Sequence, residues 1–263
     1  MTKRAVVIGA GHYLPERIVE NAEFEGKIDT SDEWIRSRSG IERRHFVGEG
    51  ETTSTMATAA AKAALADAGK TAADVDAVIV ATSTPDLTFP SAATMVQAQL
   101  EMERGFAFDV QAVCAGFVYA LANANALIVS GQADRVLVIG SETFSKIMDW
   151  TDRSTSVLFG DGAGAILLEA QDGDGTAGDR GILSTDLNSD GRYKDLLYVD
   201  GGISTARPAI CACRGIRSSV TRLKSSPPLQ TPRWTVPESA PRTSTGSSRI
   251  RRISVLFKAL PKS

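Results

Sequence analysis

The 263-residue chain has few of the residues that most often build a cross-link or a catalytic site. It holds three cysteines and two histidines, His12 and His45. Three cysteines are too few and too unevenly placed for a disulfide framework, which favours a reducing compartment. Both histidines lie far upstream of Cys114, the cysteine in the most reactive-looking context, so that cysteine has no evident base nearby in the sequence.

Long hydrophobic runs are also missing. The longest apolar region, Val113 to Val129, is interrupted by Asn123 and Asn125, which favours a buried helix over a membrane span. The start of the chain, "MTKRAVVIGAGHYLPE", has too short an apolar run for a signal peptide. We therefore expect a cytoplasmic protein that does not enter a membrane, and we expect neither a metal site nor a bound cofactor.

Acidic residues are almost absent from the end of the chain. From Arg207 onward there are 12 lysines and arginines and a single acid, Glu238, whereas residues 1–206 hold 17 basic and 30 acidic residues. The same tail has 7 of the 10 prolines but 2 of the 23 glycines. No helical or strand period persists in it, so we expect residues 207–263 to form a basic, Pro/Ser/Arg-rich tail without regular structure.

Strand and helix patterns alternate in the first part of the chain. Strands are expected at residues 4–9, 75–84, 105–113, 134–142 and 162–170, and helices at 54–69, 90–101 and 114–131. Gly69 and Gly131 stand where helices end, and Pro90 stands in the first turn of one. This alternation predicts an α/β fold, layered around a largely buried sheet.

Two glycine-rich segments match nucleotide-binding loops only in part. "VIGAGHYLPE", residues 7–16, lacks the third glycine of a dinucleotide fingerprint, and Pro15 falls where the helix would open. "FGDGAGAILLE", residues 159–169, lacks the Lys-Ser/Thr pair of a phosphate loop. We interpret the first as a turn that ends a strand and the second as a tight turn that leads into one.

Cys114 lies in "DVQAVCAGFVYAL", between a strand pattern and a helix pattern. One interpretation is a buried structural cysteine, since cysteine behaves as a small hydrophobic residue. The other is a nucleophile, because the N-terminus of a helix stabilises a thiolate. In that case the small residues Ala115 and Gly116 would let a substrate carbonyl approach their amides, which would form half of an oxyanion hole for acyl transfer.

The segment "DTSDEWIRSRSGIERRH", residues 29–45, combines Trp34 with four arginines. It is either a solvated, charged helix or a clamp for an anionic aromatic ligand. Arginine recognises phosphates and a tryptophan face stacks on a purine, so coenzyme A would satisfy the second interpretation.

Taken together, "SDEWIRSRSGI", "FPSAA", "FDVQAVCAGFVYAL", "DWTDRST" and "FGDGAGA" resemble the β-ketoacyl-acyl carrier protein synthase III family. The resemblance implies an α/β thiolase-like fold of five layers (αβαβα) in a homodimer. Residues 1–172 would be an intact N-terminal half with the nucleophile and 173–206 the connection into a C-terminal half that is largely missing. The implied reaction starts fatty acid synthesis: acyl-CoA, with acetyl-CoA the expected donor, and malonyl-acyl carrier protein give 3-oxoacyl-acyl carrier protein.

The resemblance also assigns residues. It makes Cys114 the residue that carries the acyl group as a thioester. Trp34 and Arg153 would sandwich the adenine of coenzyme A, Thr30 would hydrogen-bond the base, and Arg38 would lie near the phosphates. Phe89 would reach across the dimer to shape the acyl pocket of the partner.

The family's catalytic His and Asn have no counterpart after residue 206, so we expect the chain to be inactive as written. The match runs through "LYVDGGIST" and then stops within one or two residues. When the codons for residues 245–263 are read in another frame, they permit a family-like "HQAN" segment. We therefore expect that one nucleotide was lost from the gene near codon 206.

Two other interpretations remain open. One is that the chain is another thiolase-fold acyl-CoA condensing enzyme, such as a hydroxymethylglutaryl-CoA synthase or a chain-length-specific homologue. Alternatively, a non-catalytic scaffold would use the basic tail to bind nucleic acid. That tail has only Trp234 and Phe257 as aromatic residues, which disfavours nucleic-acid binding, and we expect no such partner.

Overall fold

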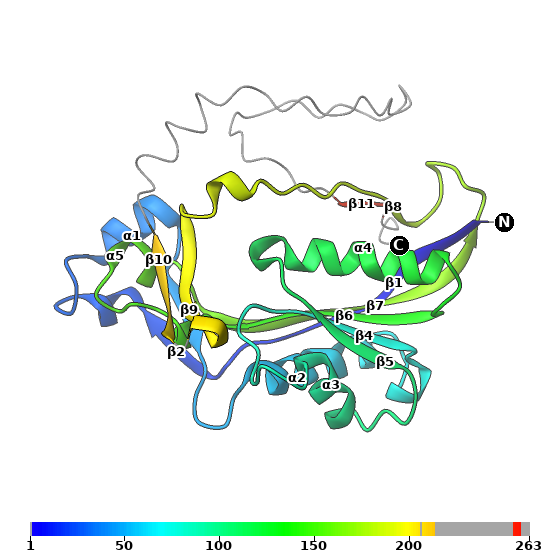
Figure 1. Cartoon of the computed structure of the whole chain (residues 1–263), viewed down its shortest axis with the longest axis horizontal. Coiled ribbons are helices and arrows are strands. Elements are labelled where there is room, and N and C mark those ends of the chain that lie inside the picture. The colour runs from blue at the N-terminus through cyan, green and yellow to red at the C-terminus, as the bar shows by residue number, and fades with distance from the viewer. Residues whose placement is uncertain (1, 206, 214–254, 259–263) are drawn as a thin grey trace.

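A computed structural model describes residues 2–205, 207–213 and 255–258 (Figure 1). The strands are β1 (Thr2–Tyr13), β2 (Arg17–Glu20), β3 (Arg43–Phe46), β4 (Ala77–Ala81), β5 (Phe106–Val110), β6 (Arg135–Thr143), β7 (Asp161–Gly173), β8 (Gly181–Thr185), β9 (Leu197–Gly202), β10 (Arg207–Cys213) and β11 (Val255–Lys258). The α-helices are α1 (Asp32–Ser39), α2 (Thr53–Asp67), α3 (Ala92–Gln99), α4 (Gly116–Val129) and α5 (Arg153–Ser156). Short 3₁₀ turns, η1 to η6, are Asn21–Phe24, Ala72–Asp74, Val113–Ala115, Phe144–Lys146, Gly191–Tyr193 and Ile203–Thr205.

A five-stranded sheet forms the centre of the molecule, in the order β1-β7-β6-β4-β5. Strands β4, β5 and β6 are parallel, and β7 is antiparallel to both of its neighbours. Every residue of β4 is buried, as expected for a central strand with helices on both faces. This confirms the expected strands and the layered α/β fold.

Helices α2 and α3 cover one face of the sheet and α4 covers the other (Figure 1). Helix α2 lies close to β1, because its inward face is built from alanines. In β1 a Cβ added at Gly9 would lie 2.4 Å from the carbonyl oxygen of Ala64, and one at Gly11 would lie 2.4 Å from that of Ala60. Close helix packing therefore explains the glycine pair. The predicted strand-ending turn was wrong, because β1 continues through both glycines to Tyr13.

The second glycine-rich segment leads into a strand, as predicted. A turn at Val157 and Leu158 precedes β7, which begins at Asp161, so Gly162 and Gly164 lie inside the strand. A Cβ at Gly162 would lie 3.1 Å from the side chain of Leu14.

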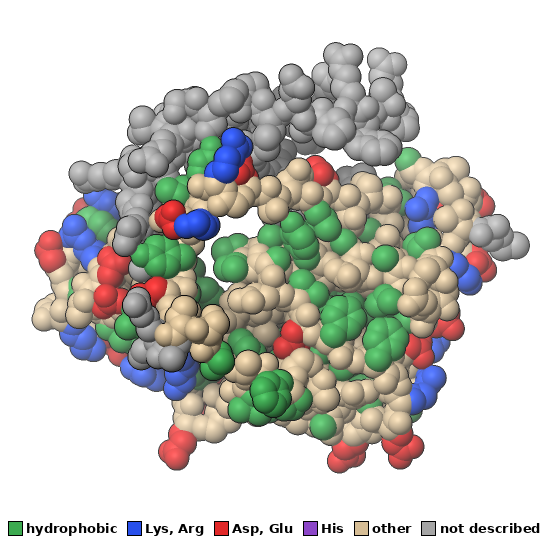
Figure 2. Space-filling model, viewed as in Figure 1, with side chains coloured by type: hydrophobic (Ala, Val, Ile, Leu, Met, Phe, Trp, Pro, Cys, Tyr) green, Lys and Arg blue, Asp and Glu red, His purple; other side chains and the backbone are tan. Residues whose placement is uncertain are grey.

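Helix α4 is apolar nearly all round but is buried on one side only. Its inward face consists of Ala120, Leu121, Ala124 and Ile128. Phe117 and Leu127 are partly buried, and Val129 is 47% exposed. Figure 2 shows hydrophobic side chains gathered over α4 and an open gap between α4 and the segment of η5 and β9. The sequence predicted a buried helix, but the residues that the structure describes cover only one of its two faces.

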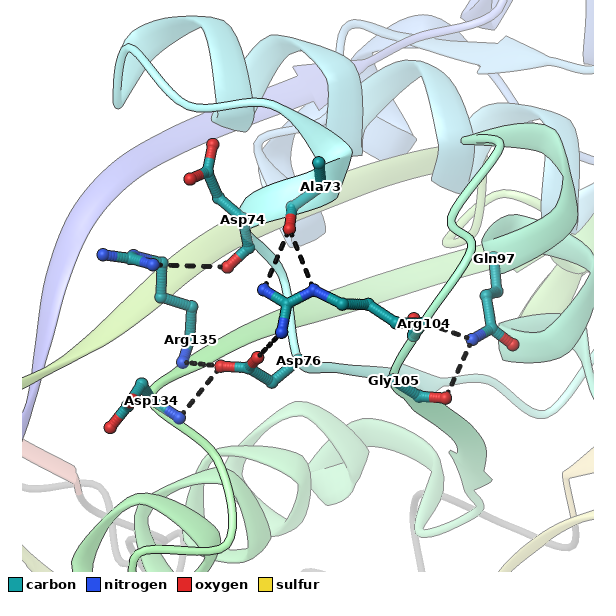
Figure 3. A network of polar contacts seen from close by, with 8 residues as sticks. All are labelled: Ala73, Asp74, Asp76, Gln97, Arg104, Gly105, Asp134 and Arg135. Atoms are coloured by element: carbon teal, nitrogen blue, oxygen red, sulfur yellow. Dashed lines mark hydrogen bonds and ion pairs between the residues drawn. The ribbon is translucent and has the colours of Figure 1, made fainter.

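A polar cluster ties the amino ends of the three parallel strands together (Figure 3). One carboxylate oxygen of Asp76 accepts hydrogen bonds from the backbone N–H groups of Asp134 (3.0 Å) and Arg135 (2.9 Å). The other lies 3.2 Å from Arg104, whose guanidinium also donates to the carbonyl of Ala73. These contacts fix the end of the sheet that is opposite the carboxyl ends of the parallel strands, where Cys114 lies.

Two parts of the basic tail carry strands, contrary to the expectation that it would lack regular structure. Strand β10 pairs antiparallel with β9, and β11 pairs antiparallel with β8. The buried Cys211 also donates its backbone N–H to the carbonyl of Ile147 at 2.7 Å. Backbone hydrogen bonding to a preceding strand needs little side-chain periodicity, so the pattern gave no signal. The remainder of the tail, 214–254 and 259–263, lies outside the described residues. Within the described part of the chain, no helix has the length and apolar character that crossing a membrane requires.

Candidate active site

Cys114 lies at the carboxyl edge of the parallel strands, between β5 and α4. It occupies the middle of η3, and α4 begins two residues later at Gly116. The side chain of Cys114 is exposed, so the interpretation of a buried structural cysteine is wrong. An exposed thiol beside a helix N-terminus is the arrangement that the nucleophile interpretation requires.

The backbone before Cys114 is strained. Val113 has φ +49°, in the left-handed region that a β-branched residue rarely adopts. Such strain costs on the order of 1–3 kcal/mol and persists only where the surrounding structure holds it. Here it turns the chain sharply from β5 into η3 and leaves the side chain of Cys114 at the surface.

The two amides expected to form part of an oxyanion hole are already engaged. The N–H of Ala115 donates to the carbonyl of Ala112 at 3.0 Å, and the N–H of Gly116 donates to the carbonyl of Val113. The oxyanion-hole interpretation of these amides is therefore wrong for this conformation. The small size of Gly116 has another effect, because an added Cβ would lie 3.3 Å from the Cβ of Ala81. Gly116 thus lets the start of α4 pack against the end of β4.

Glu142, near the end of β6, is a residue that sequence reasoning missed. Its carboxylate accepts the Ser83 N–H at 2.8 Å and the Thr84 hydroxyl at 2.6 Å. Burial raises the pKa of Glu142 above its ordinary value, although these hydrogen bonds oppose the shift. Thr82 precedes Ser83 and Thr84 in the loop after β4, and its N–H donates to the carbonyl of Val110 at 3.2 Å. This loop therefore lies against the end of β5, close to the turn with Cys114. The sequence feature that could have identified Glu142 is its place as an acid at the end of the apolar run "RVLVIGSE".

The structure brings together Trp34, Arg38 and Arg153. The guanidinium carbon of Arg38 lies 4.4 Å from the centroid of the Trp34 ring, and that of Arg153 lies 4.8 Å from it. A base stacked between two flat groups needs about 7 Å, which is twice a contact distance of roughly 3.5 Å. The predicted pair is therefore assembled but closed, and opening it for a base requires Arg153 to move by about 2 Å relative to the ring.

Thr30 lies beside this pair. Arg153 donates to the carbonyl oxygen of Asp29 at 2.6 Å and to its carboxylate at 2.9 Å, which places the chain next to Thr30 against the guanidinium. The hydroxyl of Thr30 is buried, and within the described residues it has no hydrogen-bond partner. An orphaned hydroxyl next to a closed slot fits a group that is satisfied when a ligand opens the slot.

Phe89 lies apart from these residues and is 83% exposed. Its loop leads into α3, whose N-terminus is held by Asp109 of β5: the carboxylate accepts the N–H groups of Ala92 and Ala93, both at 2.8 Å. The family resemblance assigns Phe89 to a dimer contact, and its exposure is compatible with one.

Neither histidine is hydrogen-bonded to Cys114 within residues 2–205, 207–213 and 255–258. His12 lies on β1, whereas Cys114 follows β5 at the opposite edge of the sheet. These two strands are four strand spacings apart, or about 19 Å. His45 faces the carbonyl of Pro15 through its Nδ1 atom. The described parts of the tail, "RPAICAC" and "VLFK", contain no histidine, asparagine or acid.

Comparisons with known proteins agree on one family. A sequence model described as "3-Oxoacyl-[acyl-carrier-protein (ACP)] synthase III" matches residues 108–191. The β-ketoacyl-[acyl-carrier-protein] synthase III of Ruegeria sp. (strain TM1040) is 76% identical over 229 residues, which cover 86% of this chain and 71% of that protein. The synthase III of Ruegeria pomeroyi is 78% identical over 205 residues, which cover 78% of this chain and 64% of that protein.

Solved structures lead to the same group. The synthase III from Pseudomonas aeruginosa superimposes with a TM-score of 0.75 at 43% identity, covering 83% of this chain and 66% of that one. The synthase III from Aquifex aeolicus superimposes with a TM-score of 0.73 at 42% identity, covering 83% of this chain and 67% of that one. The matched part of each relative is thus about two thirds of its length.

The layered α/β fold and these matches define the chain as an acyltransferase of the condensing-enzyme class. More closely, the chain belongs to the β-ketoacyl-[acyl-carrier-protein] synthase III family. That family carries out the initiating condensation of fatty acid synthesis, with acyl-CoA and malonyl-acyl carrier protein as substrates.

Proposed function

We propose that this chain, in the cytoplasm, performs the first half of the family reaction. The thiolate of Cys114 attacks the thioester carbonyl of acyl-CoA, for which acetyl-CoA is the expected donor. The bond between the carbonyl carbon and the sulfur of coenzyme A breaks, and free coenzyme A leaves with a proton. The observation that carries the proposal is the exposed Cys114 on a strained turn at a helix N-terminus, inside the segment that matches the family.

Acyl-CoA is a substrate here and coenzyme A is a product, so no resident cofactor is proposed. The assembled pair of Trp34 and Arg153 would open to admit the adenine, with Arg38 near the phosphates and Thr30 beside the base. Stacking on an aromatic ring contributes about 1–3 kcal/mol per base, a useful share of the affinity for a nucleotide.

We further propose that the chain does not complete the condensation. Decarboxylation of malonyl-acyl carrier protein develops enolate charge that fixed donors must stabilise, and loss of one such donor costs roughly 10²–10³-fold in rate. In the described part of the chain, neither histidine accompanies Cys114. The loss of one nucleotide near codon 206 would explain both the missing donors and the basic tail. Resequencing the gene there would test whether the reading frame has changed.

Mass spectrometry of the intact protein tests the acyl-transfer step. After incubation with acetyl-CoA, the parent chain should gain one acetyl group, and Cys114→Ser should gain none. Cys211→Ala is the matched cysteine control and should be acylated like the parent. Acylation of Cys114→Ser at the parent level would refute the proposal. Adding malonyl-acyl carrier protein should consume no acyl-enzyme, and formation of 3-oxoacyl product would contradict the second part.

Trp34→Ala separates coenzyme A recognition from the chemistry at Cys114. It should slow acylation by acetyl-CoA at low substrate concentration by about tenfold, which corresponds to about 1.4 kcal/mol of lost stacking. It should leave acylation by the thioester of acetic acid with N-acetylcysteamine unchanged, because that donor has no adenine. Equal effects on both donors would show that Trp34 does not contact the base.

A homodimer built across β5 is also proposed. Strand β5 is the last strand of the sheet, and its Phe106 and Phe108 rings stack with centroids 6.5 Å apart. Phe106 is 39% exposed, and Figure 2 shows hydrophobic side chains over this edge. An open edge with apolar side chains pairs readily with a second copy related by a two-fold axis. Phe89 lies on the loop before α3, which packs against β5, so it would meet the partner there.

A further inference from the structure

A pocket of about 370 Å³ lies between the antiparallel pair of β2 and β3, the η1 turn and the segment that follows β6. Its lining residues include neither Cys114 nor the pair of Trp34 and Arg153, and the proposed reaction does not use it. Its volume is within the range of roughly 300–1,000 Å³ that is typical of small-molecule sites.

The walls of this pocket are held in place by a buried carboxylate. Asp161, 5% exposed, accepts hydrogen bonds from the N–H of Val47 and the N–H of Ser145, both at 2.8 Å, and from the Ser145 hydroxyl. Val47 follows β3 on one wall, and Ser145 lies in η4 on the other. The pocket is therefore part of the folded protein before any ligand arrives.

One side of the pocket is aromatic. Trp150 is 42% exposed, and its ring meets Phe46 edge-on at 5.2 Å between centroids and lies 6.3 Å from Phe24. A half-exposed indole supported by two phenyl rings presents an apolar face that a flat ring would cover.

The rim of the pocket carries an excess of positive charge. Arg17, Lys27 and Lys146 line it, and Glu23 is the one acid. Glu23 lies 3.4 Å from Arg17 in a pair whose side chains are 40% and 59% exposed. Across the described ranges, no carboxylate lies within 4.0 Å of the amino group of Lys27 or Lys146, so both charges are available to a ligand.

A further cation lies behind the aromatic wall. Arg44 is buried, and its guanidinium carbon lies 4.8 Å from the centroid of Phe24. Its hydrogen bonds in the described part of the chain go to neutral oxygens of Asn21, Val157 and Val19. A buried cation without a carboxylate partner is costly, and an anion in the adjoining pocket would reduce that cost.

We propose that this pocket binds a small organic anion with a flat aromatic ring. The ring lies against Trp150, and a phosphate or carboxylate group lies between Lys27 and Lys146. A ligand needs both groups for full affinity, because the aromatic ring makes the apolar contacts with Trp150 and the anionic group pairs with the two lysines.

Isothermal titration calorimetry with 1-naphthyl phosphate tests this site, with inorganic phosphate and 1-naphthol as the two halves of the probe. The intact probe should bind to one site, at least tenfold more tightly than either half, and binding should weaken as salt is added. The double variant Lys27→Gln/Lys146→Gln should bind about tenfold more weakly, which corresponds to about 1.4 kcal/mol shared between two exposed charges. Equal affinity for 1-naphthol and 1-naphthyl phosphate would overturn the proposal.

Three control variants locate the probe. Lys62→Gln removes an exposed lysine from α2 and should leave affinity unchanged. Trp150→Phe keeps a ring and should retain binding, whereas Trp150→Leu should lose it by about tenfold. Trp34→Ala should have no effect. Loss of binding in Trp34→Ala with retention in the double lysine variant would place the probe at the adenine slot and overturn the proposal. Cys114→Ser should bind the probe normally, so failure of the acyl-transfer proposal would not affect this result.

Discussion

Asp109 links the strand that leads to Cys114 with the helix that follows Phe89. Its two carboxylate oxygens accept the first free N–H groups of α3, those of Ala92 and Ala93, each at 2.8 Å. The hydroxyl of Ser91 already caps the third N–H, that of Thr94, at 3.2 Å. Asp109→Ala therefore removes two charge-assisted hydrogen bonds while leaving the local cap in place.

The expected loss follows from those two bonds and the helix terminus. Each bond to a half-buried carboxylate contributes about 1 kcal/mol net. A negative charge at a helix N-terminus adds about 0.5 kcal/mol. The free energy of unfolding of Asp109→Ala should thus be lower by about 2.5 kcal/mol. Asp109→Asn keeps one acceptor and should cost roughly half as much, about 1–1.5 kcal/mol.

Urea unfolding followed by circular dichroism measures these differences, with the midpoint falling by about 1 M in Asp109→Ala. Asp172→Ala is the matched control, because Asp172 forms a 3.0 Å pair with Lys3 in which both side chains are about half exposed. It should change stability by less than about 0.5 kcal/mol. An Asp109→Ala protein as stable as Asp172→Ala would refute the reasoning that this carboxylate anchors α3.

Two further predictions concern Glu142 and the open edge of the sheet. Because the pKa of Glu142 is raised in the folded state, its contribution to stability is full below the ordinary value of 4.5 and is lost as pH rises through the folded value. The parent should therefore lose stability towards neutral pH relative to Glu142→Gln, and parallel urea midpoints from pH 4 to about 7 would contradict this. In sedimentation velocity at micromolar concentration the parent should be a dimer and Phe106→Lys a monomer, whereas a monomeric parent would count against pairing through β5.

Local sequence accounts for most of the secondary structure. The buried strands, the helix ends at Gly69 and Gly131 and the junction at Cys114 all follow from short-range patterns, because periodicity and backbone preferences act over a few residues. The glycine pair in β1 was misread, because its cause lies in another element: the backbone of α2 packs against Gly9 and Gly11. A local pattern holds no information about which helix will lie over a strand.

By itself, the sequence determined the α/β class, the nucleophile candidate Cys114 and the family resemblance, since each rests on residues that are close together in the chain. Tertiary structure alone decided which distant residues meet. It closed Arg153 over Trp34, buried Glu142 against the loop after β4, and used Asp161 to join the walls of the pocket around Trp150. These contacts arise from packing between elements far apart in sequence, and their burial and charge depend on all of the neighbours together.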